Sequence, residues 1–308
     1  MAIIQPRSIH YSQNFLHSRR LVDQLIDGSS LTSCDDVIEI GPGRGIITEP
    51  LALRCRQVVA IEKDQSLVGP LRQRLAGFSN VDVHGGDFLE YTLPRHPYKV
   101  FASIPFNVTA AIVGKLTSGL SPPEDCYLVV QREAALRFVG TPRGTLTSVL
   151  LRPWFEPSVV HSFRRTDFDP VPNVEIVLLR LRRRIPPLVG SEKGQLFRDF
   201  VVHCFTAWQP SLAATLDGLL GRRDSVIVIR RAGIPLGCRP GEVCCHQWLR
   251  LFGGVVEQAR PGRLLRIVGS EDLLRRQQAK LGKIHRTHVG PGHSSLPFSP
   301  GGRRGRGQ

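Results

Sequence analysis

The amino-acid sequence predicts an α/β fold of the Rossmann-like, doubly wound type, followed by a small all-helical region. Short apolar runs alternate with segments of helical spacing through the first 180 residues, as in strands joined by covering helices. Several of these runs are hydrophobic almost without interruption, which is typical of parallel strands buried on both faces. A length of 308 residues leaves room for a second domain.

The predicted strands define the sheet. They are Val37–Ile40, Gln57–Glu62, Val81–His84, Val100–Ile104, Tyr127–Val130, Val159–Phe163 and Val174–Leu181. Helical spacing lies between them at Ile46–Leu53, Gln65–Leu75 and Ala110–Leu120. Only ten residues with two prolines, Arg164–Asn173, separate the last two runs, so we expect these to form an antiparallel pair at one edge.

The character of the chain changes after residue 182. The basic, proline-broken stretch 182–187 reads as a linker, and helical patterns follow it at Gly194–Trp208, Pro210–Leu220, Asp224–Ala232, Glu242–Leu251 and Glu271–Leu281. From Gly282 the chain is rich in Gly, Ser, Pro, His and Arg and predicts a disordered tail. We therefore predict domains at 1–182 and 183–276 and a tail at 277–308.

Composition narrows the possible partners. The formal net charge is +15, from 41 Lys and Arg against 26 Asp and Glu, so the protein should attract a polyanion. No apolar stretch is long enough for a membrane span, and the first residues lack the pattern of a signal peptide. Seven cysteines without C-x-x-C spacing, and ten histidines without a cluster, argue against disulfides and metal and for a reducing, cytoplasmic compartment.

The most informative motif follows the first predicted strand. Glycines at 41, 43 and 45 allow a sharp turn and close approach of a ligand at a strand end. A dinucleotide fingerprint would need a glycine at 46, where Ile46 stands, and the acid Glu39 would disfavour a pyrophosphate. A carboxylate here suits the ammonium group of an amino-acid moiety, so we predict that Glu39, Gly41 and Gly43 bind such a ligand.

Acids also end the next two strands. Glu62 lies 21 residues after Gly41 and is placed to bind the two hydroxyls of a ribose, with Ile61 beside an adenine. Asp87 can accept a hydrogen bond from the adenine amino group while Phe88 packs nearby. Either acid alone is compatible with an ordinary solvated strand end.

The fourth strand ends in Ser103-Ile104-Pro105-Phe106. An exocyclic amine on a base is a poor nucleophile because its lone pair is delocalised into the ring. A fixed hydroxyl and a backbone carbonyl can accept its two hydrogens, and an aromatic ring can stack on a base removed from its helix. This pattern predicts methylation of such an amine.

Taken together, these motifs resemble the rRNA adenine N6-methyltransferase superfamily. The resemblance rests on Gln13–Leu16, Glu39–Gly45, Glu62, Gly86-Asp87 and Ser103–Phe106, and it extends from about residue 8 to about residue 255. Tyr11–Leu16, the Ser-Ile-Pro-Phe form and Phe168–Val174 are most similar to the erythromycin-resistance (Erm) branch.

The resemblance implies a class I methyltransferase sheet that uses S-adenosylmethionine as methyl donor and needs no metal. We expect donor binding and catalysis in residues 1–182 and RNA binding by the helical domain of residues 183–276. It implies one adenine in the peptidyl-transferase region of 23S rRNA as acceptor, in protein-free RNA or a partly assembled large subunit, and resistance to macrolides, lincosamides and streptogramin B. We expect a monomer that does not bind membranes.

The same resemblance assigns roles to individual residues. Asn14 and Leu16 would contact the methionine end of the donor, and Ser103 with the carbonyl of Ile104 would hold the target N6. Ser103 is also expected among the residues that bind the donor. Phe106 would stack on the target base, and Phe168 would close its other face. The family usually has Asn where Ser103 stands, and a serine hydroxyl is shorter and lacks an amide donor.

Three alternatives stay open at this point. One is a dimethyltransferase of small-subunit rRNA that acts on adjacent adenines. Another is a non-catalytic nucleic-acid-binding relative that has kept the fold, and the third is a DNA adenine methyltransferase, for which the chain offers no separate target-recognition domain.

Overall fold

The computed structural model of the protein describes residues 15–119 and 121–280. The strands are β1 (Phe15–Leu16), β2 (Asp36–Ile40), β3 (Gln57–Glu62), β4 (Val81–Gly85), β5 (Lys99–Ser103), β6 (Asp125–Gln131), β7 (Phe155–Ser162), β8 (Phe168–Asp169) and β9 (Ile176–Arg183). The α-helices are α1 (Arg19–Asp27), α2 (Thr48–Ala52), α3 (Gln65–Arg74), α4 (Thr109–Ser118), α5 (Arg132–Val139), α6 (Leu146–Leu151), α7 (Ser191–Thr206), α8 (Leu212–Leu220), α9 (Arg222–Arg231), α10 (Cys245–Gln258), α11 (Pro261–Leu264) and α12 (Ser270–Lys280). Short 3-10 helices are η1 (Phe106–Val108), η2 (Arg165–Asp167) and η3 (Pro240–Glu242).

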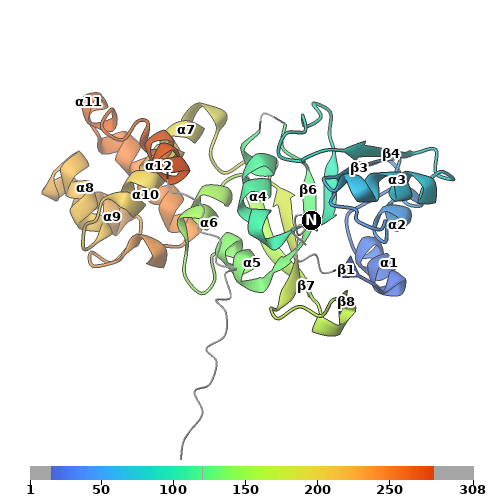
Figure 1. Cartoon of the computed structure of the whole chain (residues 1–308). Helices are drawn as coiled ribbons and strands as arrows, with labels where there is room; N and C mark the ends of the chain where they lie inside the picture. The colour runs from blue at the N-terminus through green and yellow to red at the C-terminus, as the bar shows by residue number, and fades with distance from the viewer. Residues whose placement is uncertain (1–14, 120, 281–308) are drawn as a thin grey trace, which may run out of the picture. The chain divides into compact units, whose positions relative to one another are not determined.

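Seven strands form one sheet in the order β4-β3-β2-β5-β6-β9-β7 (Figure 1). The first five of these strands are parallel to one another, and β9 runs antiparallel to both β6 and β7. The predicted Rossmann-like fold is therefore confirmed. The predicted antiparallel pair is also present, with β7 at the edge and β9 inside the sheet.

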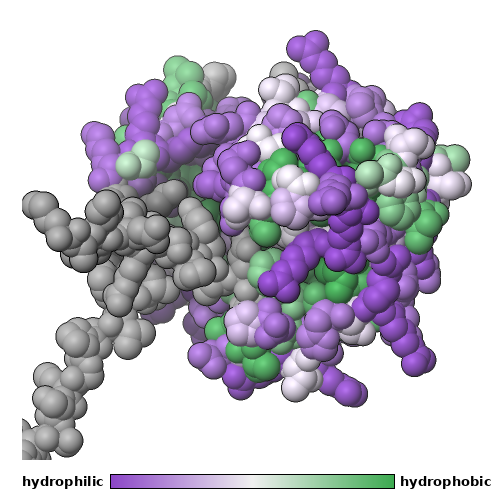
Figure 2. All heavy atoms as spheres, turned by 45° about the vertical axis from the view of Figure 1, so that its right-hand side comes forward, coloured by the Kyte–Doolittle hydropathy of each residue, from purple (hydrophilic) through white to green (hydrophobic). Residues whose placement is uncertain are grey.

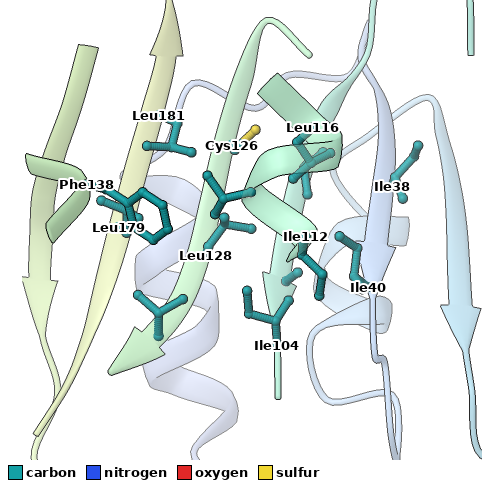
Figure 3. Packing of buried hydrophobic residues seen from close by; sticks show 14 of the residues in the cluster. Ile38, Ile40, Ile104, Ile112, Leu116, Cys126, Leu128, Phe138, Leu179 and Leu181 are labelled. Atoms are coloured by element: carbon teal, nitrogen blue, oxygen red, sulfur yellow. The ribbon is translucent and has the colours of Figure 1, made fainter. Parts of the chain in front are cut away.

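The near-continuous hydrophobicity of the strands follows from burial on both faces. Alternate residues of each strand point to opposite sides. Ile38 and Leu128 belong to the core on one face, where Ile112 and Leu116 of α4 cover the sheet (Figure 3). Their neighbours on the same strands, Val37, Tyr127 and others, belong to a second core that includes Val22 and Ile26 of α1.

Some elements differ from the prediction. The two-residue strands β1 and β8 pair with each other outside the main sheet, and helices α1, α5, α6 and α11 do not appear among the predicted segments. Helix α5 has eight residues and ends at Gly140, which adopts a left-handed conformation (φ 74°). Helices of eight residues or fewer, such as α5, α6 and α11, make little more than two turns and carry few apolar repeats, so spacing recognises them poorly.

The helical region after β9 is present as predicted. Its core contains Phe197, Phe200, Leu216, Trp248 and Phe252, all nearly inaccessible to solvent. Described residues up to Glu271 form one compact unit, and those from Asp272 onward form another. A domain boundary at 182 remains a prediction. Of the predicted tail at 277–308, residues 277–280 belong to helix α12, and residues 281–308 lie outside the described residues.

One face of the protein is largely polar. Figure 2 shows hydrophilic side chains over much of one face, with separate apolar areas between them. In the part of the chain that the structure describes, no helix combines the length and apolar character needed to cross a membrane.

Candidate active site at the carboxyl edge of the sheet

The sheet places the motif residues at one edge. Strand β2 lies between β3 and β5. After β2 the chain adds β3 and β4 on one side of it, and then crosses to the other side to add β5 and β6. Open α/β sheets bind ligands in the crevice that such a reversal creates at the carboxyl ends of the strands. The loops after β2, β3, β4 and β5 all begin there.

The glycine turn needs its glycines for conformation and for space. Gly41, Gly43 and Gly45 have φ values of 69°, 56° and 84°, in the left-handed region that side chains with a Cβ disfavour. A Cβ at Gly43 would lie 2.8 Å from Cε1 of Phe15. One at Gly41 would lie 3.4 Å from the carbonyl oxygen of Ser103, so the turn and the end of β5 are in direct proximity.

Glu62 holds this turn from the neighbouring strand. Its Oε2 accepts a hydrogen bond from the backbone N–H of Gly43 at 2.9 Å, and its Oε1 accepts one from the N–H of Asp64 at 2.8 Å. The residue is 2% exposed. Each carboxylate oxygen can still accept a further hydrogen bond from a ligand hydroxyl.

Glu39 is the most unusual group at this edge. It is fully buried, and neither carboxyl oxygen has a hydrogen-bond partner among the described residues; the hydroxyl of Thr48 is likewise unpartnered. Burial raises the pKa of Glu39 from its ordinary 4.5 to about 8, and repulsion from Glu62 adds to this, while the neighbouring Thr48 hydroxyl acts in the opposite direction without meeting the geometry of a hydrogen bond. A buried carboxyl without a partner beside a ligand-binding turn suits a cationic ligand.

Asp87 begins the loop after β4. Its Oδ1 accepts a hydrogen bond from the N–H of Leu89 at 2.9 Å, and its Oδ2 forms a 2.7 Å ion pair with Lys63. The pKa of Asp87 is lowered, chiefly by the hydrogen bond from Lys63. Phe88 and Ile61 are buried in the core at 3% and 1% exposure, so they support this corner from beneath.

The end of β5 presents the predicted acceptor groups. Ser103 is half-buried, and within the described ranges its hydroxyl makes no hydrogen bond. Ile104 is buried at 2% exposure, which fixes the backbone that follows β5. The half-buried Phe106 then begins the 3-10 helix η1, and α4 follows directly after it.

The small β1–β8 ladder joins the segment before α1 to the segment between β7 and β9. Leu16 pairs with Phe168, and Phe15 pairs with Asp169. The segment is held further by His17, whose ring Nε2 lies 2.7 Å from the carbonyl oxygen of Thr166. Asn14, predicted to contact the donor, lies outside the described residues.

A pocket joins several of these features. It is lined by Phe15, Leu16, Gly41, Pro42, Gly43, Ile46, Ile47, Ser103, Ile104, Pro105, Phe106, Val129 and Phe168. Seven predicted site residues meet there: Leu16, Gly41, Gly43, Ser103, Ile104, Phe106 and Phe168. The pocket is not lined by the other predicted residues described in the structure, which are Glu39, Ile61, Glu62, Asp87 and Phe88. Glu62 nevertheless accepts a hydrogen bond from Gly43, which does line it.

Sequence reasoning missed three participants. Phe15 belongs to the N-terminal motif, but the motif alone predicts no contact for it. Its ring packs on Gly43, and the Arg44 guanidinium lies 5.5 Å from the ring centroid. Lys63 pairs with Asp87, and the buried Thr48 hydroxyl lies near Glu39 and lowers its pKa. In residues 15–119 and 121–280, no three His, Cys, Asp or Glu side chains converge as metal ligands do.

The strand order, the glycine turn and the groups after β3, β4 and β5 define a Rossmann-like methyltransferase domain. Residues 6–253 match the family described as ribosomal RNA adenine dimethylase, and the chain belongs to that family. It is an enzyme of the rRNA adenine N6-methyltransferase class.

Relatives from two branches are similar to it. An rRNA adenine N-6-methyltransferase of Saccharopolyspora erythraea is 34% identical over 82% of this chain and 66% of that protein. Ribosomal RNA small subunit methyltransferase A of Listeria monocytogenes is 32% identical over 70% of this chain and 79% of that protein. The solved structure of 23S rRNA methyltransferase ErmE superposes with a TM-score of 0.74 at 33% identity, covering 79% of this chain and all of that one.

Proposed function

We propose that the protein transfers methyl groups from S-adenosylmethionine to N6 of one adenine in the peptidyl-transferase region of 23S rRNA. Modification there would confer resistance to macrolides, lincosamides and streptogramin B. The observation that carries the proposal is one pocket in which the glycine turn after β2 meets Ser103, Ile104 and Phe106 after β5.

The residues beside the turn fit the donor. S-adenosylmethionine supplies an electrophilic methyl group when bound. The unpartnered Glu39 carboxyl suits the cationic amino-acid end, and Gly41 and Gly43 let the backbone approach it. Glu62 would hold the ribose hydroxyls, and Asp87 would accept from the adenine amino group above the buried Ile61 and Phe88. Leu16, and Asn14 ahead of it, would border the methionine end.

The end of β5 fits the acceptor. The Ser103 hydroxyl and the Ile104 carbonyl would accept the two N6 hydrogens, which orients the nitrogen toward the methyl group. Phe106 would stack on the extruded base, and Phe168, placed opposite Leu16 by the β1–β8 ladder, would close the pocket. Catalysis would rest on positioning, with no covalent intermediate on the protein.

The choice of 23S rRNA has separate support. ErmE, a 23S rRNA methyltransferase, is matched over its whole length, and the S. erythraea relative is named as an N-6-methyltransferase. The Ser-Ile-Pro-Phe form after β5 and Phe168 favour the same branch. We propose a monomer that acts in the cytoplasm on free or partly assembled large-subunit RNA.

A second candidate is dimethylation of small-subunit rRNA. It is supported by the Listeria relative, whose 32% identity is close to that of the Saccharopolyspora relative. The fold and the pocket serve either target, because both acceptors are adenine N6 atoms.

Transfer of a labelled methyl group separates the two. Full-length protein is incubated with labelled donor and protein-free 23S rRNA, 50S subunits or 30S subunits. We expect label in protein-free 23S rRNA. Label confined to 30S subunits would establish the second candidate, and no label in any RNA would favour a non-catalytic relative.

A further inference from the structure

Trp208 differs from the two other tryptophans of the chain. Trp248 is fully buried in the helical core, and Trp154 lies under the guanidinium of Arg198, 4.4 Å from its ring centroid. Trp208 is 99% exposed, in the loop between α7 and α8. It is also the one non-glycine residue with a positive φ, 51°, in the described part of the chain.

Neither property helps the protein to fold. An indole left in water contributes nothing to a core, and a left-handed backbone disfavours any residue with a Cβ. Such an outlier at an exposed position points to a role outside folding. Trp208 is not among the residues that line the pocket at the sheet edge, so that role lies elsewhere on the protein.

The loop that carries Trp208 is fixed at its far end. The Ser211 hydroxyl accepts a hydrogen bond from the N–H of Ala214 and caps α8. The N–H of Leu212 donates to the carbonyl of Cys238 at 2.9 Å, which ties this loop to the segment that follows α9. Leu236, 40% exposed, belongs to that second segment. The indole therefore projects from a braced loop.

The segment tied to this loop is bordered by cations. Arg230 and Arg231 end α9, Arg239 follows Cys238, and the guanidinium of Arg250 lies beside Gly233. All four arginines are exposed, and in the described ranges none of their guanidinium groups forms an ion pair, although Glu242 lies beside Arg239 and accepts a hydrogen bond from its backbone N–H at 2.9 Å. From residue 183 to residue 271 the chain has thirteen Lys and Arg against seven Asp and Glu. An anionic partner matches this charge.

We propose that Trp208 stacks on an unpaired base of the RNA substrate, at a site separate from the methylation pocket, while the neighbouring arginines contact its phosphates. The inference rests on the proposed function only in taking RNA as the substrate. Single-stranded bases stack on aromatic side chains without strong sequence preference, and cations beside the ring contact the backbone. Trp208 would thus orient the RNA and take no part in the chemistry.

Intrinsic fluorescence tests the contact, because Trp208 is the exposed tryptophan. Full-length protein is titrated with a single-stranded RNA of mixed sequence and with a blunt RNA duplex of equal length. We expect the single strand to quench the solvent-exposed emission and the duplex to quench it much less. Trp208→Ala should lose this quenching and bind the single strand ~5- to 100-fold more weakly, the range typical of one lost stacking contact.

Control variants separate stacking from damage to the fold. Trp208→Phe keeps a ring and should retain most of the affinity, whereas Leu53→Ala removes an equally solitary apolar side chain, 65% exposed on the sheet region, and should change nothing. Trp208→Ala should unfold at no lower temperature than the wild type. In methyl transfer to 23S rRNA it should raise KM and leave kcat unchanged.

Two results would overturn the inference. Equal RNA affinity of the wild type and Trp208→Ala would exclude a base contact. Quenching by assembled 50S subunits without quenching by protein-free RNA would assign Trp208 to a protein partner. If the wild type methylates RNA while Trp208→Ala behaves identically, this inference fails and the proposed function stands; if the wild type methylates no RNA, the proposed function fails.

Discussion

Replacing Glu39 by Gln should change how the stability of the protein depends on pH. Glu39 is buried without a hydrogen-bond partner among the described residues, and its pKa is about 8 in the folded protein against an ordinary 4.5. Between these two values the folded protein retains a proton that the unfolded chain has lost. The free energy of unfolding therefore falls as pH rises through this range.

The size of the effect follows from the two pKa values. Each pH unit well inside the range lowers the free energy of unfolding by roughly 1.4 kcal/mol. Between pH 5.5 and pH 7.5 the loss due to Glu39 amounts to roughly 2.5 kcal/mol. Glutamine does not titrate, so the stability of Glu39→Gln relative to the wild type should increase by this amount over the same interval.

Urea denaturation of both proteins without donor, followed by circular dichroism at several pH values, measures this difference. All other titrating groups are common to the two proteins and cancel in the comparison. A difference that stays constant from pH 5.5 to pH 7.5 would mean that Glu39 does not retain its proton in the folded protein, and it would refute the pKa of about 8.

Three further predictions concern other groups. Ser103→Ala should lower kcat for methyl transfer ~10-fold or more, with a much smaller effect on donor affinity measured by calorimetry, since the hydroxyl is proposed to act chiefly on the acceptor amine; an unchanged kcat contradicts its role. Glu62→Ala should weaken donor binding and lower the melting temperature, because it leaves the N–H groups of Gly43 and Asp64 without their acceptor; donor affinity equal to that of the wild type would show that Glu62 only shapes the turn. Asp125→Ala should lower the free energy of unfolding, measured by urea denaturation, by about 3–5 kcal/mol, because it leaves Arg180 without the buried carboxylate to which it donates at 2.6 Å. Glu156→Gln removes the exposed partner of Arg182 and should lower it by less than about 1 kcal/mol. Equal losses in the two variants would refute the role given to burial.

The sheet could be predicted from the sequence because its strands are buried on both faces. Gln57–Glu62 was predicted with both ends correct, and the other strands were shifted by a few residues. The ends of strands and helices depend on hydrogen bonds and caps that apolar spacing does not record. Helix α5 depends on the left-handed Gly140 at its end, a signal that is present in the sequence but weak by itself.

The convergence of the site was predictable in part. Parallel strands bring Glu62, Asp87 and Ser103 to one edge whatever the details of the loops. The meeting of Leu16 with Phe168 was not predictable from spacing, because it depends on two strands of two residues each, which carry no periodicity. The left-handed backbone of Trp208 is set by the loop around it, and the tryptophan itself does not favour it.

The central claim is that the pocket at the ends of β2 and β5 methylates adenine N6 in 23S rRNA. The most direct measurement is mass spectrometry of nucleosides from protein-free 23S rRNA treated with the protein and S-adenosylmethionine, with the modified position mapped by primer extension. We expect N6-methylated or N6,N6-dimethylated adenine at one position of the peptidyl-transferase region. Modification of another base or atom, or none in 23S rRNA, would contradict it.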